Sequence, residues 1–425
     1  MSQLNNFISI HNTTPKKPKM INADFHIHSK YSGGTSSNME LPIIAKQAEL
    51  KGLDLVGTGD AIHTGWREHI KSNFTEISEG IYKIKNSGKT KFIITTEVED
   101  EKRVHHVILF PSVESAENLY EIFKKYSTDI DKDGRPHLRL GAEEIVDFSR
   151  EVSAMVGPAH AFTPWTSLYK SYDSIRDCYG DNLKHIHFLE LGLSADSDMA
   201  DLIPELSGIT FMTNSDCHSP WPHRLGREFN RIDLKNSFSF SDIRDSIINH
   251  KFALNVGLNP LEGKYHLTAC SRCFLKFKPV DASGIKWRCP ECGGIIKRGV
   301  DTRINELAKL KKPEHPGHRP PYIHIIPLAE VISLSMKIRT LTSKKIQEKW
   351  NTLVEHFGTE INVLIDSDVE DIKKIDPKIG VIIDKFRNGR IKYIAGGGGA
   401  YGRPTLDANE KDRFWGFGQR GLNEF

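Results

Sequence analysis

Short apolar runs alternate with helix-like stretches over roughly the first 258 residues of the chain. The apolar runs cover residues 53–56, 91–95, 107–110, 154–156, 188–191 and 209–212. Between them, the spacing of apolar positions predicts helices over residues 37–51, 112–125, 141–153, 198–206 and 241–250. This alternation is typical of an α/β fold with mostly parallel strands.

The pattern changes after residue 258. Residues 315–322 are stiff and rich in proline, which predicts an ordered connector or a binding loop and not a helix. Helices are predicted over residues 327–337, 342–356 and 368–386, with a short strand over 361–364. We therefore divide the chain into a flexible arm at 1–19, an α/β domain at 20–258, a small cysteine module at 264–300, a helical and glycine-loop region at 301–404 and a peripheral tail at 405–425.

The composition is that of a soluble globular protein. The chain has 425 residues, of which 38% are hydrophobic and 27% charged, so it can bury a core and form two or three domains. It has no run of about 18 apolar residues and no signal-peptide pattern, so we expect no membrane span. Four of its six cysteines stand in two Cys-x-x-Cys pairs, which favours a cytoplasmic location.

Two histidines stand two positions apart near the start of the chain, in the segment Asp24-Phe25-His26-Ile27-His28. In a β-strand alternate side chains share a face, so His26 and His28 project together. Two neighbouring imidazoles are good first ligands for a divalent metal. A half-buried strand with two hydrogen-bonded histidines is the alternative that this pair alone leaves open.

Polar residues that can bind metal stand beside nearly every apolar run. They are Asp60, Glu97, His106, His160, Glu190, Asp216 and His218. In barrels of parallel strands the functional side chains gather at the C-terminal strand ends, so we expect one shared site. Clustered carboxylates and imidazoles hold divalent ions that stabilise the oxygens of a phosphoryl displacement. A satisfied polar network is the alternative, whereas the lack of a Gly-x-Ser-x-Gly or Walker motif argues against a serine hydrolase or an NTPase.

The strongest motif is the pair of Cys-x-x-Cys sequences formed by Cys270, Cys273, Cys289 and Cys292. Their spacing lies in the range of a four-thiolate zinc site, and the glycines after the second pair let backbone amides approach the sulfurs. Because four thiolates close the coordination sphere, we predict a zinc-ribbon-like module with one structural zinc. Four free or redox-active thiols are the alternative.

The cysteine module also concentrates positive charge. Twelve basic and four acidic residues lie between Lys264 and Lys312, a net charge of +8 in a chain whose total is +3. Aromatic residues are interleaved with them, which is typical of a surface that binds nucleic acid. The candidate substrate contacts there are Lys276, Lys278 and Arg288. A solvated basic face is the alternative.

Four consecutive glycines stand at residues 396–399. Such a run indicates a place where a ligand or another backbone approaches closely. Gly397, Gly398, Tyr401 and Arg403 are therefore candidates to cradle a phosphate or to line a pocket for a base. A flexible C-terminal linker is the alternative.

The ordered set of His26-x-His28, Asp60, Glu97, His106, His160 and Asp216-x-His218 resembles the metal-binding motifs of the PHP (polymerase and histidinol phosphatase) superfamily. The resemblance implies a distorted seven-stranded βα barrel that holds two or three Zn, Mn or Mg ions. It implies a first metal held by His26, His28, Glu97 and Asp216, and these four residues are the implied catalytic residues. It implies a second metal held by Glu97, His106 and His160, and a third held by Asp60 and His218. Segment 29–34 lacks the further third-site ligand that the superfamily often has. His105 can replace His106, because adjacent residues point to opposite faces.

The order of the parts, from this domain through the cysteine pairs and residues 318–327 to the glycine loop, resembles the endonuclease Q family over residues 21–403. The resemblance implies a DNA repair endonuclease that cuts 5′ to uracil, hypoxanthine, xanthine and abasic sites. The implied partner is damaged DNA, with a DNA sliding clamp as a further candidate. Two other functions stay open: a phosphatase of a small phosphorylated metabolite, and a non-catalytic DNA-binding module.

Overall fold

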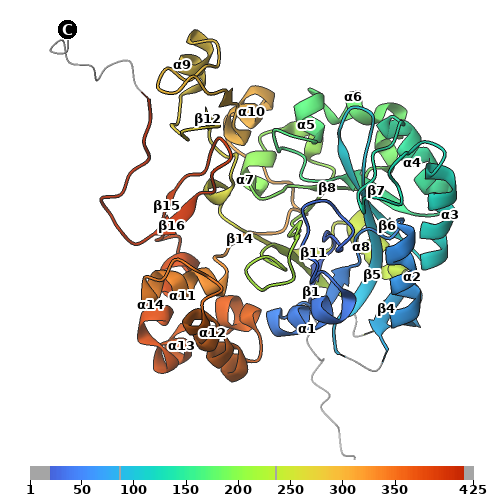
Figure 1. Cartoon of the computed structure of the whole chain (residues 1–425), viewed down its shortest axis with the longest axis horizontal. Helices are drawn as coiled ribbons and strands as arrows, with labels where there is room; N and C mark the ends of the chain where they lie inside the picture. Colours follow the sequence, from blue (N-terminus) through green and yellow to red (C-terminus); the bar gives the residue numbers. More distant parts are fainter. Residues whose placement is uncertain (1–19, 86–87, 235–236, 416–425) are drawn as a thin grey trace, which may run out of the picture.

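The computed structural model describes residues 20–85, 88–234 and 237–415. The arm expected at residues 1–19, and the part of the expected tail beyond residue 415, lie outside these ranges. Figure 1 shows a large α/β body from the first part of the chain, a small module from the cysteine-rich part and a separate group of C-terminal helices.

A ten-stranded mixed sheet forms the α/β body. Its hydrogen-bonded order is β14 (Tyr322–His324), β11 (Phe252–Gly257), β10 (Phe229–Asp233), β1 (Met20–Asp24), β2 (Leu55–Gly57), β5 (Lys91–Glu99), β4 (Ile81–Ile84) and β3 (Phe74–Ser78). Two more strands extend it, because β6 (His105–Phe110) pairs with β5 and β7 (Met155–Pro158) pairs with β6. A separate parallel pair consists of β8 (Phe188–Glu190) and β9 (Thr210–Met212).

Two expectations about this sheet need correction. Among the described strands the sheet does not close on itself, so a seven-stranded barrel is not confirmed. Most strand pairs in it are antiparallel, and only β1–β2, β2–β5 and β11–β14 are parallel. Strands β5 and β6 are antiparallel because a short turn connects them, whereas a parallel crossover needs about a dozen residues or more.

Helices pack beside the sheet at four of the five predicted places, as α1 (Leu41–Lys51), α3 (Val113–Phe123), α4 (Ala142–Glu151) and α8 (Phe240–Ile248). The helix predicted over 198–206 divides into α7 (Ser197–Ala200) and a 3-10 turn at Pro204–Leu206, because proline has no N–H to continue a helix. Helices that were not predicted are α2 (Thr64–Asn73), α5 (Leu168–Ser171), α6 (Ile175–Tyr179) and the 3-10 helix Gly180–His185.

The hydrophobic core lies on both faces of the sheet. Successive residues of β5 point to opposite faces, so Phe92 packs in one apolar cluster and Ile93 in the other. Helix α8 contributes Ile243 and Ile247 to the second cluster. With both faces covered, the candidate polar side chains lie at the strand ends and in the loops that follow them.

The cysteine module has a small core of its own. Strand β12 (Ala269–Cys270) pairs with β13 (Ile296–Lys297), α9 (Pro279–Gly284) lies between them in the chain, and α10 (Val300–Leu307) follows. Its apolar cluster holds Leu275, Phe277, Ala282 and Ile296 together with two cysteines. A hairpin of β15 (Lys392–Ile394) and β16 (Arg403–Thr405) lies between this module and the C-terminal helices (Figure 1).

The C-terminal helices are α11 (Leu328–Met336), α12 (Lys344–Phe357), α13 (Val369–Ile375) and α14 (Pro377–Arg387). The helix predicted over 368–386 divides at Pro377, which begins α14. The strand predicted over 361–364 is wrong, because these residues enter a π-helix at Asn362–Asp366; a short apolar run fits a buried helix as well as a strand. Within the described ranges, no helix is long and apolar enough to cross a membrane.

Candidate metal centre and adjoining cavities

Two segments that are far apart in the sequence lie side by side beyond the end of β1. The backbone N of His28 donates to the O of Cys217 (3.1 Å). The backbone N of Asp216 donates to the O of His26 (2.9 Å). These two hydrogen bonds hold both predicted histidines next to the predicted aspartate.

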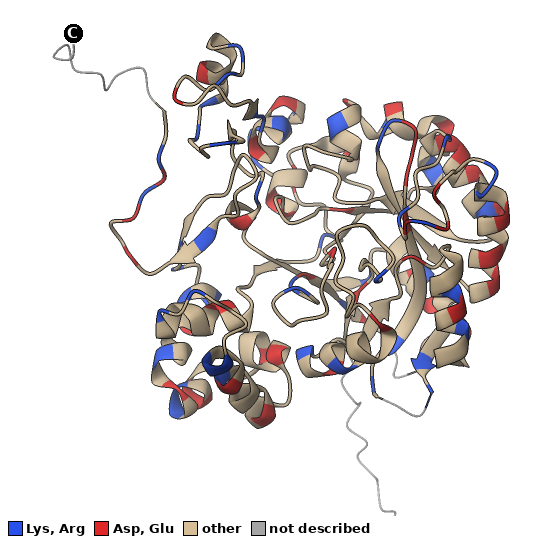
Figure 2. Ribbon diagram, in the orientation of Figure 1, with Lys and Arg blue, Asp and Glu red and all other residues tan. Residues whose placement is uncertain are grey.

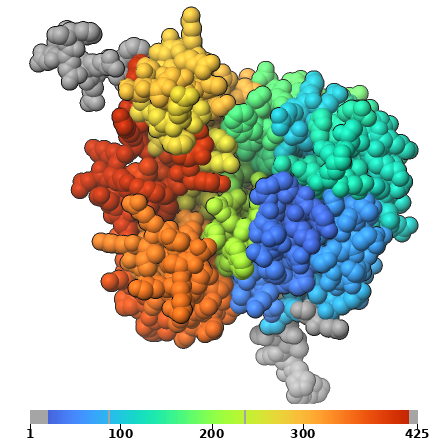
Figure 3. Space-filling model, in the orientation of Figure 1, coloured from blue at the N-terminus to red at the C-terminus, as the bar shows by residue number. Residues whose placement is uncertain are grey.

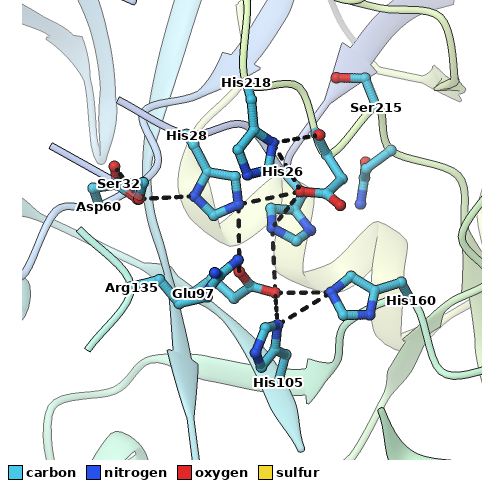
Figure 4. Close-up of polar contacts among 12 residues, drawn as sticks. His26, His28, Ser32, Asp60, Glu97, His105, Arg135, His160, Ser215 and His218 are labelled. Carbon is cyan, nitrogen blue, oxygen red and sulfur yellow. Dashed lines mark hydrogen bonds and ion pairs between the residues drawn. The ribbon is translucent and has the colours of Figure 1, made fainter. Parts of the chain in front are cut away.

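Both histidines point toward Glu97 (Figure 4), and both also approach Asp216. Nε2 of His28 lies 3.3 Å from Glu97 Oε2 and 3.2 Å from Asp216 Oδ1. Nε2 of His26 lies 3.6 Å from Glu97 Oε1 and 3.8 Å from Asp216 Oδ1. Three groups have their ligand atoms within 4.8 Å of one another: His26, His28 and Glu97; His28, Asp216 and His218; and Glu97, His105 and His160. Because the groups share residues, they form one continuous candidate metal centre.

Hydrogen bonds behind the two histidine rings aim their Nε2 atoms into the centre. Nδ1 of His26 contacts Glu190 Oε2 at 2.8 Å, and Nδ1 of His28 contacts Asp60 Oδ1 at 3.2 Å. His26 Nε2 is buried and has no hydrogen-bond partner among the described residues. A buried polar atom without a partner is costly, so this nitrogen fits a divalent cation. Imidazole and carboxylate donors together suit ions such as Zn²⁺ or Mn²⁺.

Asp60 lies behind His28 and outside the three ligand groups, which corrects its prediction as a third-metal ligand. The side chain is fully buried. It accepts hydrogen bonds from the backbone N of Ser29 (2.7 Å) and from Ser32 Oγ (2.9 Å), which turn it toward Nδ1 of His28. We therefore assign Asp60 to orienting His28. Glu190, which the sequence marked only as a polar residue within an apolar run, has the same role for His26.

His105 contacts the centre in place of the predicted His106. Nδ1 of His105 lies 2.9 Å from Glu97 Oε1, and Nε2 of His160 lies 3.1 Å from the same oxygen. His106 instead contacts the Tyr179 hydroxyl at 2.8 Å and Asp100 Oδ2 at 3.2 Å. The register explains the choice: Glu97 pairs with Val107 across β5 and β6, so its face of β6 also holds His105, two residues away.

The charges within the centre keep its two carboxylates ionised. Burial opposes the charged form of Glu97, but the charges of His105 and His26 outweigh burial and hold the pKa of Glu97 well below its usual range. Burial also opposes ionisation of Asp216, yet the hydrogen bond from His28 and the charge of His26 hold its pKa well below its usual range. Both carboxylates are therefore available to a cation at neutral pH.

Three residues at or behind the centre have strained backbones. The φ angle is 50° at Asp60, 27° at His160 and 45° at Asp216, in the left-handed region that side chains with a Cβ seldom adopt. Strain of this kind costs about 1–3 kcal/mol per residue and clusters at functional sites. Eight other non-glycine residues among those described also have a positive φ, so this strain accompanies the centre and is not confined to it.

A cavity of about 300 Å³ opens onto the centre, and we call it the reaction cavity. Its lining includes the candidate ligands His105, His160, Asp216 and His218, and beside them Arg135, Trp165, Arg227, Lys264, Tyr265 and Tyr401. Arg135 was not predicted, and its Nη1 lies 3.4 Å from Glu97 Oε2. A guanidinium in this place suits a phosphate oxygen. Trp165 is 42% exposed at the same cavity.

A second cavity, of about 920 Å³, adjoins the first, and we call it the basic groove. Its lining has five basic side chains, those of Arg224, Arg227, Lys337, Arg339 and Arg403, and two carboxyl groups, those of Glu262 and Glu330, whose pKa burial raises. Arg227 and Tyr401 line both cavities. The Tyr401 ring has Arg224 Cζ at 5.5 Å and Lys264 Nζ at 5.8 Å from its centroid. The groove is therefore suited to an anionic ligand.

The rest of the surface differs from the basic groove. Figure 2 shows acidic residues along α3 and α4, at the edge of the molecule away from the C-terminal helices. Figure 3 shows the C-terminal helices and the hairpin, in orange and red, on one side of the molecule and the start of the α/β body, in blue, on the other. The arginines and the lysine of the basic groove come both from the α/β body and from the C-terminal part of the chain.

The predicted substrate contacts separate into two sets. Tyr401 and Arg403 line the basic groove. Lys278 and Arg288 are exposed on the cysteine module and line neither of the two cavities. Lys276 is buried and forms an ion pair with Asp412, so its prediction as a DNA contact is corrected.

The glycine loop packs against the cysteine module. A Cβ at Gly397 would lie 2.6 Å from the O of Leu267, and one at Gly398 would lie 2.3 Å from the O of Cys270. The φ angle of Gly398 is 66°, which also favours glycine. The run of glycines therefore marks a close approach of two backbones, and the predicted contact of Gly397 and Gly398 with substrate is corrected.

The four predicted cysteines lie together in the module. The sulfurs of Cys270 and Cys292 are 3.5 Å apart, those of Cys273 and Cys289 are 3.6 Å apart, and all four lie within 4.8 Å. The hydrogen bond from the N–H of Gly294 is the main cause that lowers the pKa of Cys292 to about 7. A Cβ at Gly294 would lie 2.8 Å from Cys270 Sγ, so a glycine is needed there. This cradle of sulfurs and amide donors fits a closed four-thiolate metal site.

Comparison with known proteins gives two relatives and one family model. Residues 327–390 match the MJ0043 C-terminal domain. The uncharacterized protein MJ0043 of Methanocaldococcus jannaschii is 47% identical over 63% of this chain, which spans 35% of the length of that relative. The uncharacterized protein YqxK of Bacillus subtilis is 30% identical over 91% of this chain and 99% of its own length.

Two solved structures are similar over nearly the whole chain. One is the lesion-specific endonuclease PfuEndoQ from Pyrococcus furiosus, which is 47% identical with a TM-score of 0.86, over 92% of this chain and 96% of that chain. The other is endonuclease Q in complex with a 27-mer duplex that has an abasic lesion at the active site. It is also 47% identical, with a TM-score of 0.87, over 92% of this chain and 97% of that chain.

Proposed function

The chain belongs to the endonuclease Q family, and from this premise we propose that it is a metal-dependent endonuclease that acts at lesions in DNA. The proposed substrates are duplexes with an abasic site or with a deaminated base, namely uracil, hypoxanthine or xanthine, and the cut lies 5′ to the lesion. The abasic lesion at the active site of the related complex supports this substrate class.

One observation carries the proposal. The three ligand groups overlap at His28 and Glu97, and the reaction cavity opens directly onto them. We propose that they hold two or three divalent ions, Zn²⁺, Mn²⁺ or Mg²⁺. When bound, such ions activate water and stabilise the leaving oxygen of a phosphodiester.

The protein's own residues position the substrate for this reaction. His26, His28, Glu97 and Asp216 would hold the ions. His105 and His160 would hold a further ion together with Glu97, so that His105 takes the place predicted for His106. Arg135 faces the same cavity and is placed to bind a phosphate oxygen of the substrate. Glu190 and Asp60 keep the two histidine rings in a fixed orientation and tautomer.

We place the DNA across the two cavities. The backbone beside the lesion follows the basic groove, where Arg224 and Arg403 contact phosphates. Tyr401 is 49% exposed at the junction and stacks on the strand as it enters the reaction cavity. A mispaired deaminated base costs less to unstack than a normal one, which favours lesions. We propose that the cysteine module binds one structural zinc and holds the glycine loop beside Tyr401. A DNA sliding clamp stays a candidate partner, on the sequence resemblance alone.

The test uses end-labelled duplexes of one sequence that carry uracil, hypoxanthine, xanthine, an abasic site or no lesion. We expect metal-dependent nicks 5′ to each lesion, with 3′-hydroxyl and 5′-phosphate ends, and no nick in the undamaged duplex or with chelator. Turnover of a generic phosphate ester without nicking would instead indicate a small-molecule phosphatase. Binding of the lesion duplexes without nicking would indicate a non-catalytic module.

A further inference from the structure

A buried ion pair joins the α/β body to the C-terminal helices. Lys51 is the last residue of α1, and its side chain is 0% exposed, as is that of Glu360. Lys51 Nζ lies 2.8 Å from Glu360 Oε1 and also donates to the O of Pro222 (2.7 Å). A fully buried charge pair is tolerated only where further hydrogen bonds complete it.

Glu360 supplies those further bonds from the C-terminal side. Its Oε1 accepts from the backbone N of Leu328 (3.0 Å), at the start of α11. Its Oε2 accepts from Trp350 Nε1 (2.7 Å), in α12. Glu360 therefore fixes two C-terminal helices to one lysine of the α/β body.

Lys51 also holds a loop of the α/β body, residues 219–228, which connects His218 to β10. The loop lies directly on the end of α1, because a Cβ at Gly226 would be 3.1 Å from Lys51 Cγ and 2.9 Å from Leu53 Cδ1. The φ angle of Gly226 is 60°, so glycine suits both the space and the backbone. The loop thus rests on the aliphatic part of Lys51 while the ammonium binds its Pro222 carbonyl.

This loop carries the basic wall of the groove. Arg224 stands over the Tyr401 ring at 5.5 Å. Arg227 donates from Nε and Nη2 to the O of Ser215 (3.1 and 3.0 Å), immediately before Asp216. A shift of the loop would therefore move Arg224 and Arg227 relative to Tyr401 and the candidate metal centre.

We propose that the Lys51–Glu360 pair is a positioning device for DNA binding, through which the C-terminal helices hold loop 219–228 so that Arg224 meets the DNA backbone. This inference rests on the proposed function and extends it. Lys51 and Glu360 are too deeply buried to contact the substrate, so they act only through the loop. Removing the pair is expected to weaken DNA binding more than it slows the cut in bound DNA.

The chain offers a matched control at the same seam. Arg231, in β10, forms an ion pair with Asp366 of the π-helix at 2.8 Å, and its Nε donates to Asn22 Oδ1 (2.9 Å). This second pair joins the same two parts of the molecule, and these bonds do not involve loop 219–228. Arg231→Met therefore removes an ion pair from the seam without releasing the loop.

The experiment compares Lys51→Met, the double variant Lys51→Met/Glu360→Gln and Arg231→Met in the full chain. Glu360→Gln in the double variant avoids a buried carboxylate without a partner and keeps one oxygen to accept from Leu328 N or Trp350 Nε1. Thermal unfolding of each variant checks that it is folded. The readouts are the Kd for an uncleavable abasic duplex, the single-turnover nicking rate at saturating DNA, and the metal content, all measured below the midpoint of thermal unfolding. We expect the Kd of both Lys51 variants to rise about tenfold, as for the loss of one charge-assisted contact, with the saturated rate within about threefold.

A double-mutant cycle separates positioning from general stability. In the parent, Arg224→Ala is expected to raise the Kd about tenfold, but in the Lys51→Met/Glu360→Gln background by less than about threefold, because the arginine is already displaced. Unchanged DNA affinity in the Lys51 variants, full additivity with Arg224→Ala, or an equal loss in Arg231→Met would each overturn the inference. The proposed function is tested separately, since it fails only if the parent does not nick lesion duplexes.

Discussion

The two candidate metal centres of this protein are built in opposite ways. The four cysteines lie between residues 270 and 292, on two turns of one small module, and their sulfurs lie within 4.8 Å of one another. The histidine and carboxylate centre draws its ligands from positions 26 to 218 and opens onto a cavity. A closed set of soft thiolates serves structure, whereas an open set of nitrogen and oxygen donors leaves room for a substrate.

The two centres also differ in the amount of apolar core around them. The histidine rings are held by buried hydrogen bonds to Glu190 and Asp60 at the end of a sheet whose two faces both carry large apolar clusters. The cysteine module has a core of only a few apolar side chains. We therefore expect a metal to support folding in the module and reactivity in the α/β body.

The largest expected effect comes from Asp216→Asn, which keeps the shape of the side chain but removes a charged oxygen donor. Because this residue belongs to the candidate metal centre, we expect nicking to fall by roughly three orders of magnitude or more, with the unfolding midpoint and DNA affinity largely kept. Nicking rate, thermal unfolding and DNA binding are measured on the same preparation. Asp371→Asn, on the exposed face of α13, is the control. Nicking of Asp216→Asn within about tenfold of the parent would refute the ligand assignment.

Cys289→Ala should affect folding of the cysteine module, whereas Asp216→Asn should affect nicking and leave folding intact. Structural zinc sites contribute about 10–16 kcal/mol of apparent binding free energy, so losing one ligand should unfold the module. We expect lower zinc content and rapid proteolysis within residues 264–300, while the α/β body stays resistant. Cys178→Ala, a buried cysteine outside the module, should leave both readouts unchanged. Parent-like zinc content and protease resistance in Cys289→Ala would refute a structural zinc.

A third pair of variants tests which of two adjacent histidines belongs to the centre. His105→Ala should lower nicking at least about 100-fold and reduce the metal content, because it removes a candidate ligand. His106→Ala should keep the metal but lose about 1–3 kcal/mol of unfolding free energy, since Tyr179 and Asp100 lose a partner. Metal analysis and chemical denaturation distinguish the two. The reverse pattern would restore His106 as the ligand.

These contrasts also explain how far the sequence could be interpreted. The cysteine spacing is a local property, and the structure brings those four residues together as the motif predicts. The His-x-His pair was found from its two-residue spacing, and Glu97 and Asp216 were found because each stands beside an apolar run. The choice between His105 and His106 depends on the register of β5 and β6, which no local pattern of the chain contains.

Other predictions failed because they depend on partners that are distant in sequence. Asp60 follows a strand as a ligand would, but hydrogen bonds from Ser29 and Ser32 turn it behind His28. The glycine run was correctly interpreted as a close approach, yet the approaching chain is the backbone of residues 267–270 and not a ligand. The expected barrel assumed parallel strands, and the short connection between β5 and β6 makes that pair antiparallel.

The smallest expected effect concerns a buried carboxylate that belongs to neither centre. Glu228 is fully buried, and burial raises its pKa to about 8, whereas histidines hold the pKa of the equally buried Glu97 well below its usual range. An acid whose folded pKa is raised binds its proton more tightly when folded, so stability falls as pH rises from its unfolded pKa, near 4.5, to about 8. Glu228→Gln keeps an acceptor for the backbone N of Leu258 and does not titrate. Between pH 5 and pH 8 the parent should therefore lose more unfolding free energy than Glu228→Gln, with a difference on the order of a few kcal/mol at most. The measurement is the free energy of unfolding in denaturant at several pH values across this range. If the two proteins lose stability in parallel, Glu228 is already ionised in the folded protein. Burial without a neighbouring positive charge would then not explain the difference between Glu228 and Glu97.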